Sequence, residues 1–268
     1  MTTEAKPQAR PSTRSLTDEQ LHEVMGLLKG VNSVELKLTV PESDQRSAMR
    51  ALDMDPLGAQ IRQVCFFDTP DLALNSMGLV VRARRVQGKP ADSAVKLRPV
   101  DPNDLPAELK LSPNVKVELD AMPGGFVVSA TIKGRSNNDS VRQAVFGQLP
   151  IRKLFSKEQR SYYKAHAPDA PELDQLSVLG PITVFKLSFT PEEFGRDMVA
   201  ELWMYPDNSR ILELSTKCDP SETFQVATEA RLYLSKHGID LTGDQQTKTK
   251  TALEYFVKNQ PQPTTQGN

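Results

Sequence analysis

The sequence predicts an α+β protein whose strands close into a barrel, or curve into a deeply concave sheet, under a cover of helices. Six segments alternate between aliphatic and charged residues, and this period of two places each set on one face of a strand. They span residues 33–40, 79–86, 94–98, 115–120, 199–205 and 210–217. Helices covering the aliphatic faces would turn the charged faces inward, and closure would remove exposed strand edges. For any single strand, the alternative is a half-buried sheet with its charges in water.

Start and stop signals predict the helices that would cover this sheet. They begin at Thr17, Ser43, Asn138 or Asp139, Thr190, Asp219 and Thr247. Thr17 with Gln20 forms a capping box, in which each side chain satisfies a backbone N–H of the first turn, and Thr190 with Glu193 has the same pattern. Gly238 stands where the helix that follows Asp219 would stop.

Composition excludes several classes of protein. The chain has 268 residues, with 33 basic against 34 acidic side chains, and this balance argues against a general nucleic-acid coat. No stretch approaches the roughly 20 apolar residues that span a bilayer, and no apolar segment near the start resembles a signal peptide. Cys65 and Cys218 form no CxxC pair, which excludes thiolate metal sites and disulfide scaffolds. We expect a cytoplasmic protein.

The domain organisation is simple. Residues 1–14 and 258–268 are polar, contain proline and are unpatterned, so we expect them to be disordered tails. Between them we expect a single domain over residues 15–257. The proline-rich stretch 99–113 is too short for a linker and is predicted to be a loop or insertion.

The basic residues of the charged faces are candidates for holding a polyanion. Together with basic residues elsewhere in the chain they comprise Lys37, Arg82, Arg84, Lys96, Arg98, Arg160, Lys186 and Lys250. An arginine fork matches phosphate oxygens, and lysine adds a compact charge. The alternative is solvated charge, but segment 82–98 has six basic residues against one acid, Asp92, which favours a site.

The acidic residues of the same faces are candidate ligands of a hard cation. They are Glu35, Glu118, Asp120, Glu201 and Glu213. Carboxylates without histidine or cysteine suit magnesium or manganese, although each carboxylate alone is as well explained by an ion pair with a neighbouring lysine or arginine. The chain has no GxxxxGK[ST] or GxGxxG loop and no pattern typical of a catalytic triad.

Three motifs resemble the CYTH superfamily of triphosphate tunnel metalloenzymes. VELKL (Val34 to Leu38) resembles the family's ExExK strand, and CFFDTPDLALNSMGLVVRARR (Cys65 to Arg85) is its most specific match. AELWMYPDNSRILELSTK (Ala200 to Lys217) resembles its late acidic hairpin, and TKTKTALEYF resembles the start of its closing helix. Ser33 and Ser215 stand where the family often has carboxylates.

The resemblance implies a closed eight-stranded antiparallel β-barrel, the triphosphate tunnel, with surrounding helices. Lys37, Arg82, Arg84 and Lys96 match its phosphate-binding positions, and Arg160 and Lys250 match less closely. Glu35, Glu201 and Glu213 match its metal-binding acids, with Glu118 a looser match, so Mg²⁺ or Mn²⁺ is the expected cofactor and Glu35 and Glu201 are the expected catalytic residues.

The resemblance also implies a small-molecule triphosphate as partner, either inorganic triphosphate, thiamine triphosphate or ATP. The function it favours is metal-dependent hydrolysis of a phosphoanhydride. Two alternatives stay open at this stage. One is a module that binds a triphosphate or polyphosphate without turning it over, and the other is an adenylate cyclase on the same scaffold.

Overall fold

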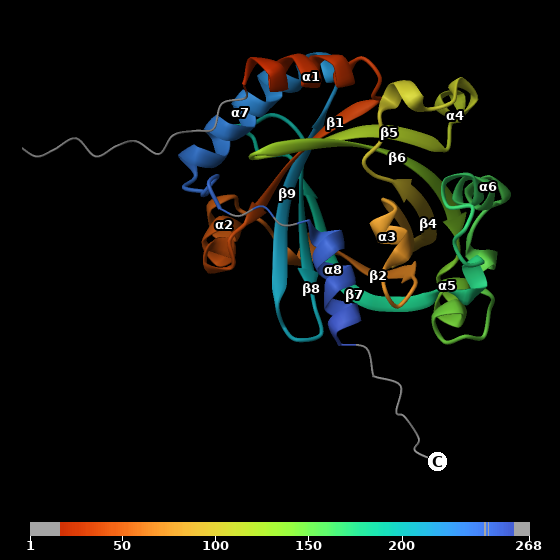
Figure 1. Ribbon diagram of the computed structural model, residues 1–268. Helices are drawn as coiled ribbons and strands as arrows, with labels where there is room; N and C mark the ends of the chain where they lie inside the picture. The colour runs from red at the N-terminus through yellow and green to blue at the C-terminus, as the bar shows by residue number, and fades with distance from the viewer. Residues whose placement is uncertain (1–16, 244, 246, 260–268) are drawn as a thin grey trace, which may run out of the picture.

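The computed structural model describes residues 17–243, 245 and 247–259. The predicted N-terminal tail lies outside these residues, as does the predicted C-terminal tail beyond residue 259. In the described part, nine strands form one closed barrel in the order β1-β5-β6-β4-β3-β2-β7-β8-β9 (Figure 1). The strands are β1 (Ser33–Val40), β2 (Gln60–Asp68), β3 (Leu79–Val86), β4 (Lys89–Leu97), β5 (Val115–Met122), β6 (Gly125–Ser136), β7 (Ser177–Phe189), β8 (Met198–Met204) and β9 (Arg210–Cys218).

Eight helices accompany these strands in the described part of the chain. They are α1 (Asp18–Leu28), α2 (Gln45–Ala51), α3 (Ala73–Ser76), α4 (Ala107–Leu111), α5 (Asn138–Val145), α6 (Lys157–His166), α7 (Thr223–Lys236) and α8 (Lys248–Lys258). In the view of Figure 1, α3 and α8 lie over the barrel opening, and the other helices lie around its outside. None of the described helices has the length and apolar character needed to cross a membrane.

The barrel is mixed, and the prediction of eight antiparallel strands was wrong in number and in direction. Residues 115–136 form the hairpin β5–β6, which inserts between β1 and β4. This insertion places β5 beside β1 in the same direction, with Glu35 next to Asp120, whereas every other neighbouring pair is antiparallel. Pro123 and Gly124 make the hairpin turn, and Gly124 supplies its positive φ of 89°.

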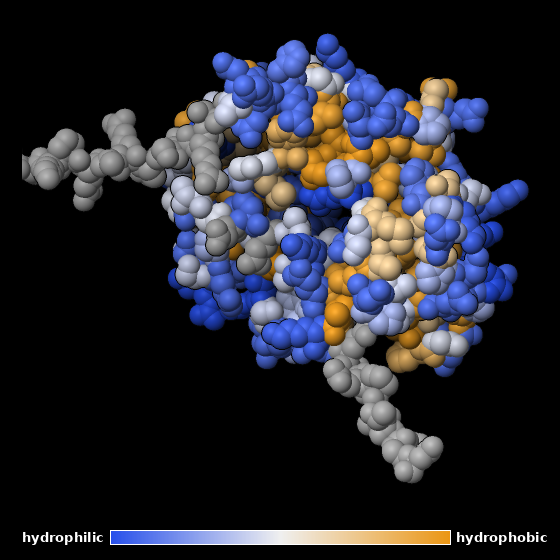
Figure 2. All heavy atoms as spheres, in the orientation of Figure 1, coloured by the Kyte–Doolittle hydropathy of each residue, from blue (hydrophilic) through white to orange (hydrophobic). Residues whose placement is uncertain are grey.

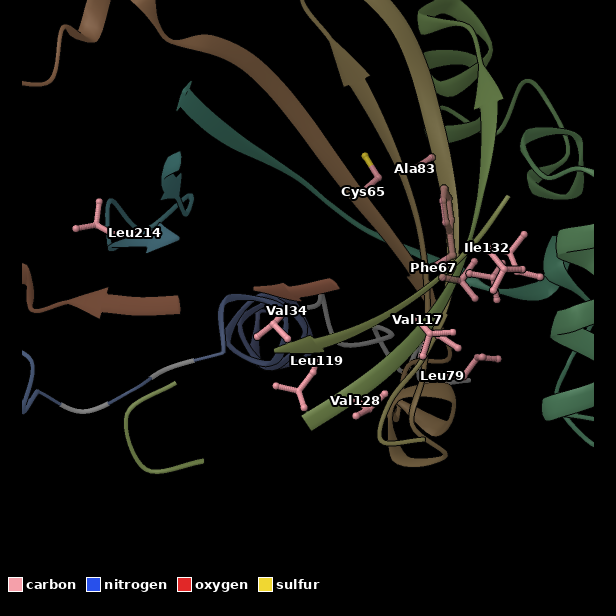
Figure 3. Packing of buried hydrophobic residues seen from close by; sticks show 14 of the residues in the cluster. Val34, Cys65, Phe67, Leu79, Ala83, Val117, Leu119, Val128, Ile132 and Leu214 are labelled. Atoms are coloured by element: carbon pink, nitrogen blue, oxygen red, sulfur yellow. The ribbon is translucent and has the colours of Figure 1, made fainter. Parts of the chain in front are cut away.

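The aliphatic strand faces pack outward under the helices, as the alternation predicted. Val34, Leu119 and Val128 are register neighbours on β1, β5 and β6, and all three are buried in one large apolar cluster (Figure 3). Because successive side chains alternate, the residues between them face the inside of the barrel. Burial of the outer face therefore fixes which charges line the interior.

The motif at residues 65–85 contains the end of β2, the helix α3 and most of β3, and its hydrogen bonds hold α3 in place at one end of the barrel. The Asp68 carboxylate, 2% exposed, accepts backbone N–H groups of Thr69 (2.7 Å), Leu74 (2.9 Å) and Asn75 (3.0 Å) and so anchors α3 at the end of β2. Gly78 follows α3 at φ 77°, where a Cβ would lie 2.5 Å from the carbonyl oxygen of Arg98, so only glycine allows this approach.

Part of the barrel interior is apolar, which the charge pattern did not predict. Phe66, Ile182 and Trp203 on β2, β7 and β8 form a second buried cluster with Ala252 and Leu253 of α8. An apolar helix face can be buried inside a barrel only where inward strand residues are also apolar. The helix α8 therefore closes part of one end of the barrel.

The helices differ from the predictions at several places, and α3, α4 and α6 were not predicted. The segment after Thr190 makes a single turn, because the Thr190 hydroxyl donates to Asp197 (2.6 Å) and Gly195 leaves the turn at φ 66°. In contrast, Ser156 and Gln159 form a complete capping box at the start of α6, which the sequence analysis did not predict.

Candidate functional site

Charged side chains meet across the inside of the barrel. Lys96 on β4 lies 3.3 Å from Asp120 on β5 although β6 separates the two strands, and Arg62 on β2 lies 3.9 Å from Glu201 on β8 across β7. Side chains can span an intervening strand in this way only on the concave inner face. Figure 2 shows the molecule hollowed between α3 and α8, with hydrophilic residues inside. The interior is thus a polar tunnel.

One part of the tunnel wall is a network of lysines and carboxylates. Lys37 lies 3.0 Å from Asp120 and 3.2 Å from Glu35, and Lys217 contacts Glu118. Burial alone would raise the pKa of Asp120, but Lys37 and Lys96 outweigh it and lower this pKa to about 2. Together with Glu201, Glu213 and Lys248, described next, these residues form what we call the lysine–carboxylate network.

Glu201 and Glu213 share one lysine from the start of α8. They are register partners on β8 and β9, and Lys248 Nζ contacts Glu201 Oε2 and lies 2.7 Å from Glu213 Oε1. The same ammonium lies 5.5 Å from the centre of the Trp203 ring. Burial opposes the charge on Glu201, yet Lys248 holds the pKa of that carboxyl well below its ordinary value.

The other part of the wall is an arginine cluster on β2, β3 and β7, made of Arg62, Arg82, Arg84 and Lys186. Arg84 makes a bidentate pair with Asp92 (2.9 Å). Arg82 and Lys186 make no hydrogen bond and no ion pair within the described residues. Burial, and then the neighbouring Arg84, lower the pKa of Arg82 to about 10. Arg82 is half-buried, and a guanidinium without a protein partner needs an anion or water in front of it.

Most of the residues that the sequence singled out do face the tunnel. Glu35, Lys37, Arg82, Arg84, Lys96, Glu118, Lys186, Glu201 and Glu213 lie on inward strand positions. Arg98 follows β4, with Nη1 4.0 Å from Asp120 Oδ2. Each of these roles stays a prediction, but the side chains lie together in one compartment.

Two of the predicted phosphate ligands, Arg160 and Lys250, lie away from the tunnel. Arg160 is on α6, where its guanidinium donates to the carbonyl oxygen of Phe155 (2.6 Å). Lys250 is 69% exposed and pairs with Glu254 one helical turn later (3.7 Å). In both cases the helix turns the side chain outward, and resemblance to a motif does not reveal that orientation.

Arg62 and Lys248 also face the tunnel, and neither was predicted from the sequence. Helical spacing gave a signal for Lys248, because it stands four residues before the buried Ala252 and so shares its face. Lys250 instead lies with Glu254 on the face of the helix that is exposed to solvent. Arg62 gave no comparable signal, because β2 was not predicted as a strand.

The donor set does not fit the expected magnesium or manganese ion. Within the described residues, no group of three or more histidine, cysteine, aspartate or glutamate side chains converges as metal ligands would. Among the expected ligands, Glu201 and Glu213 hold Lys248, Glu118 holds Lys217, and Glu35 lies 3.2 Å from Lys37. The metal therefore stays a prediction from resemblance alone.

No family model matches the sequence, and no curated protein matches it. Two solved structures have a fold similar to that of this chain. HpAC1 from Hippeastrum, named as an adenylyl cyclase candidate and described as revealing a dominant triphosphatase activity, superposes with a TM-score of 0.59 at 16% identity. The match covers 82% of this chain and 95% of that chain. An adenylate cyclase candidate from Bacillus halodurans has a TM-score of 0.57 at 11% identity, covering 82% and 97%.

Both likenesses extend over most of both chains, and identities this low speak to the fold alone. This chain therefore has the fold of these two adenylate cyclase candidates, and the resemblance found in its sequence is confirmed at the level of the fold.

Proposed function

We propose that the tunnel binds the triphosphate chain of a small molecule on the arginine cluster. The observation that carries the proposal is Arg82, whose half-buried guanidinium faces the hollow without a partner among the described residues. Its charged neighbours are the cations Arg84 and Arg62 and the acids Asp92 and Glu201, and burial together with the cations lowers its pKa to about 10. A phosphate oxygen in front of Arg82 would satisfy its donors and offset this charge.

The charge balance around Arg82 favours a highly charged anion over a single carboxylate. Four cations form the cluster, and the nearest acids are Asp92 and Glu201. Asp92 is already paired with Arg84, and Glu201 with Lys248. Because Arg84 is paired with Asp92 and Arg62 lies 3.9 Å from Glu201, the cluster keeps a surplus of about two positive charges, which the oxygens of a triphosphate would offset through the arginine forks.

Hydrolysis of the bound triphosphate is a second candidate function, favoured by two observations. The structurally similar HpAC1 is described as having a dominant triphosphatase activity. In this chain, Glu35 is 20% exposed, more than Glu118, Asp120, Glu201 or Glu213, and its lysine neighbours lie at 3.2 and 3.9 Å. Glu35 is therefore the tunnel carboxylate best suited to orient a water.

The hydrolytic step needs no nucleophile from the protein. The water oxygen would attack the terminal phosphorus as the bond to the bridging oxygen breaks, and the electron pair of that bond would leave with the diphosphate. Glu35 would take the proton of the water, while the arginine cluster offsets charge on the transferred group. Glu201 is less suited to this role because Lys248 holds its carboxylate.

Calorimetry and product analysis test both candidates. Inorganic triphosphate, thiamine triphosphate and ATP are titrated into the protein, and each mixture is then assayed for phosphate, diphosphate and cyclic AMP, with and without magnesium. Binding that Arg82→Gln weakens by about tenfold or more supports the proposal, and phosphate release that Glu35→Gln abolishes supports hydrolysis. Cyclic AMP with diphosphate would identify the cyclase reaction instead. Absence of binding by all three compounds would contradict the proposal.

A further inference from the structure

We infer that the ammonium of Lys248 replaces a divalent cation between Glu201 and Glu213, so that the tunnel takes its triphosphate without a metal ion. The inference rests on the proposed function and adds its cation requirement. The resemblance to metalloenzymes implies the opposite, and the disagreement comes from the contacts of this chain's own residues.

The two carboxylates require a cation, and the chain supplies one. Glu201 and Glu213 are cross-strand neighbours, and their side chains are only 16% and 5% exposed. Two buried carboxylates side by side repel each other unless a positive charge lies between them. Lys248 Nζ contacts both, at 2.7 Å in the case of Glu213, and no described histidine or further acid completes a metal site there.

The backbone of Lys248 is fixed, so its ammonium is a built-in part of the site. Its carbonyl oxygen accepts the hydroxyl of Tyr205 (3.1 Å). One turn later, Ala252 and Leu253 are 0% and 2% exposed in the apolar cluster inside the barrel. A metal ion between the carboxylates would have to displace the ammonium into the same compartment, which already holds the arginine cluster. The tunnel would then hold the two positive charges of the metal ion in addition to the excess positive charge of the arginine cluster.

The remaining tunnel carboxylates are satisfied in the same way. Lys217 contacts Glu118, and Ser33 Oγ donates to the same carboxylate at 3.3 Å. Ser215 Oγ donates to Glu35 at 3.3 Å. Hydroxyl donors thus stand at the two positions where further carboxylates would have strengthened a metal site. Lysines supply the positive charge that these acids need and serine hydroxyls add hydrogen bonds, so none of the acids depends on a metal ion for a partner.

The wild-type protein provides the first test. Inorganic triphosphate is titrated by calorimetry in excess EDTA and again in excess magnesium. We expect binding in EDTA to be at least as tight as in magnesium, because Mg²⁺ bound to the triphosphate itself removes negative charge from the ligand. Tight binding in magnesium that disappears in EDTA would overturn the inference while leaving the proposed function intact. Failure to bind in both buffers would contradict the proposed function itself, and the manganese measurement below would still decide the role of Lys248.

Manganese alone, followed by electron paramagnetic resonance, provides the second test. We expect no saturable Mn²⁺ site in the wild type. Lys248→Met should create one by freeing Glu201 and Glu213, seen as a saturable loss of the free Mn²⁺ signal that the wild type does not show. Lys250→Met, two residues away on the exposed face, is the matched control and should gain no site. A wild-type Mn²⁺ site that Glu201→Gln removes would overturn the inference.

A companion variant guards against misfolding of Lys248→Met, which leaves two buried carboxylates without a cation. In Lys248→Met combined with Glu201→Gln and Glu213→Gln, this repulsion is gone and the new manganese site should be absent. If Lys248→Met melts early but regains stability when Mn²⁺ is added, and the triple variant does not respond to Mn²⁺, the replacement is supported. A Mn²⁺ response shared by both variants would contradict it.

Discussion

The two parts of the tunnel wall solve the problem of buried charge in opposite ways. In the lysine–carboxylate network, Asp120 is 2% exposed and meets Lys37 at 3.0 Å and Lys96 at 3.3 Å. In the arginine cluster, Arg82 has no ion-pair partner within the described residues. The first arrangement lowers the pKa of an acid to about 2, and the second lowers the pKa of a base to about 10. The acids of the first part are paired within the fold, whereas Arg82 and Lys186 in the second part have no partner among the described residues and can take an anion or water.

This difference separates stability from binding. A carboxylate with a depressed pKa contributes stability that is present above its unfolded-state pKa and lost as pH falls through its folded-state value. An arginine with a depressed pKa has the opposite sign, because the native state disfavours its charge. We therefore expect substitutions in the network to affect folding, and substitutions in the cluster to affect affinity.

Asp120→Asn should have the largest effect on stability. The substitution leaves Lys37 and Lys96 without their shared acid, and breaking a buried pair in this way costs about 3–5 kcal/mol. Urea unfolding measures the loss. Glu193→Gln, which breaks the exposed pair with Lys236, is the control and should change stability far less. Triphosphate affinity should not fall in the folded Asp120→Asn protein, since an acid has been removed from the tunnel.

Arg82→Gln should reverse that pattern. Loss of a charge-assisted contact to phosphate costs about 1.5–3 kcal/mol, or roughly 10- to 150-fold in the dissociation constant by calorimetry. Unfolding should show no loss of stability, because the native environment disfavours the charge on Arg82. The control is Arg85→Gln on the same strand, which faces outward beside Gln63. Equal losses of affinity in both variants would remove the distinction between the two walls.

Lys96 should give the smallest effect, as a dependence on pH. Burial lowers the pKa of Lys96 to about 8 even though the Asp120 carboxylate acts to raise it. If Lys96 contacts phosphate as the sequence predicts, its protonated form makes that contact, so its contribution to affinity is present below pH 8 and is lost as pH rises through that value. Between pH 7 and 9 the loss reaches at most about tenfold. Lys96→Arg should flatten this part of the profile, and an unchanged profile would exclude Lys96 as the titrating group.

The sequence by itself determined the alternation that produces the tunnel. Val34, Leu119 and Val128 had to be buried outside, and with a period of two this sent Glu35, Lys37 and their counterparts inward. The motif at residues 65–85 also resembled the right family of folds. Strands β2 and β7 escaped prediction, because their inward positions mix charged residues such as Arg62 and Lys186 with apolar ones such as Val64 and Ile182.

Only the tertiary structure decided which charges meet. The sequence shows Glu201, Glu213 and two nearby lysines of the last helix, but not that strands β8 and β9 set the two acids side by side. The sequence also does not show which of the two lysines lies in the tunnel. Burial of Ala252 and Leu253 rotates α8 so that Lys248 lies in the tunnel and Lys250 lies in solvent. Period and composition are properties of neighbours along the chain, whereas the pairing of buried charges depends on elements that meet only when the barrel closes.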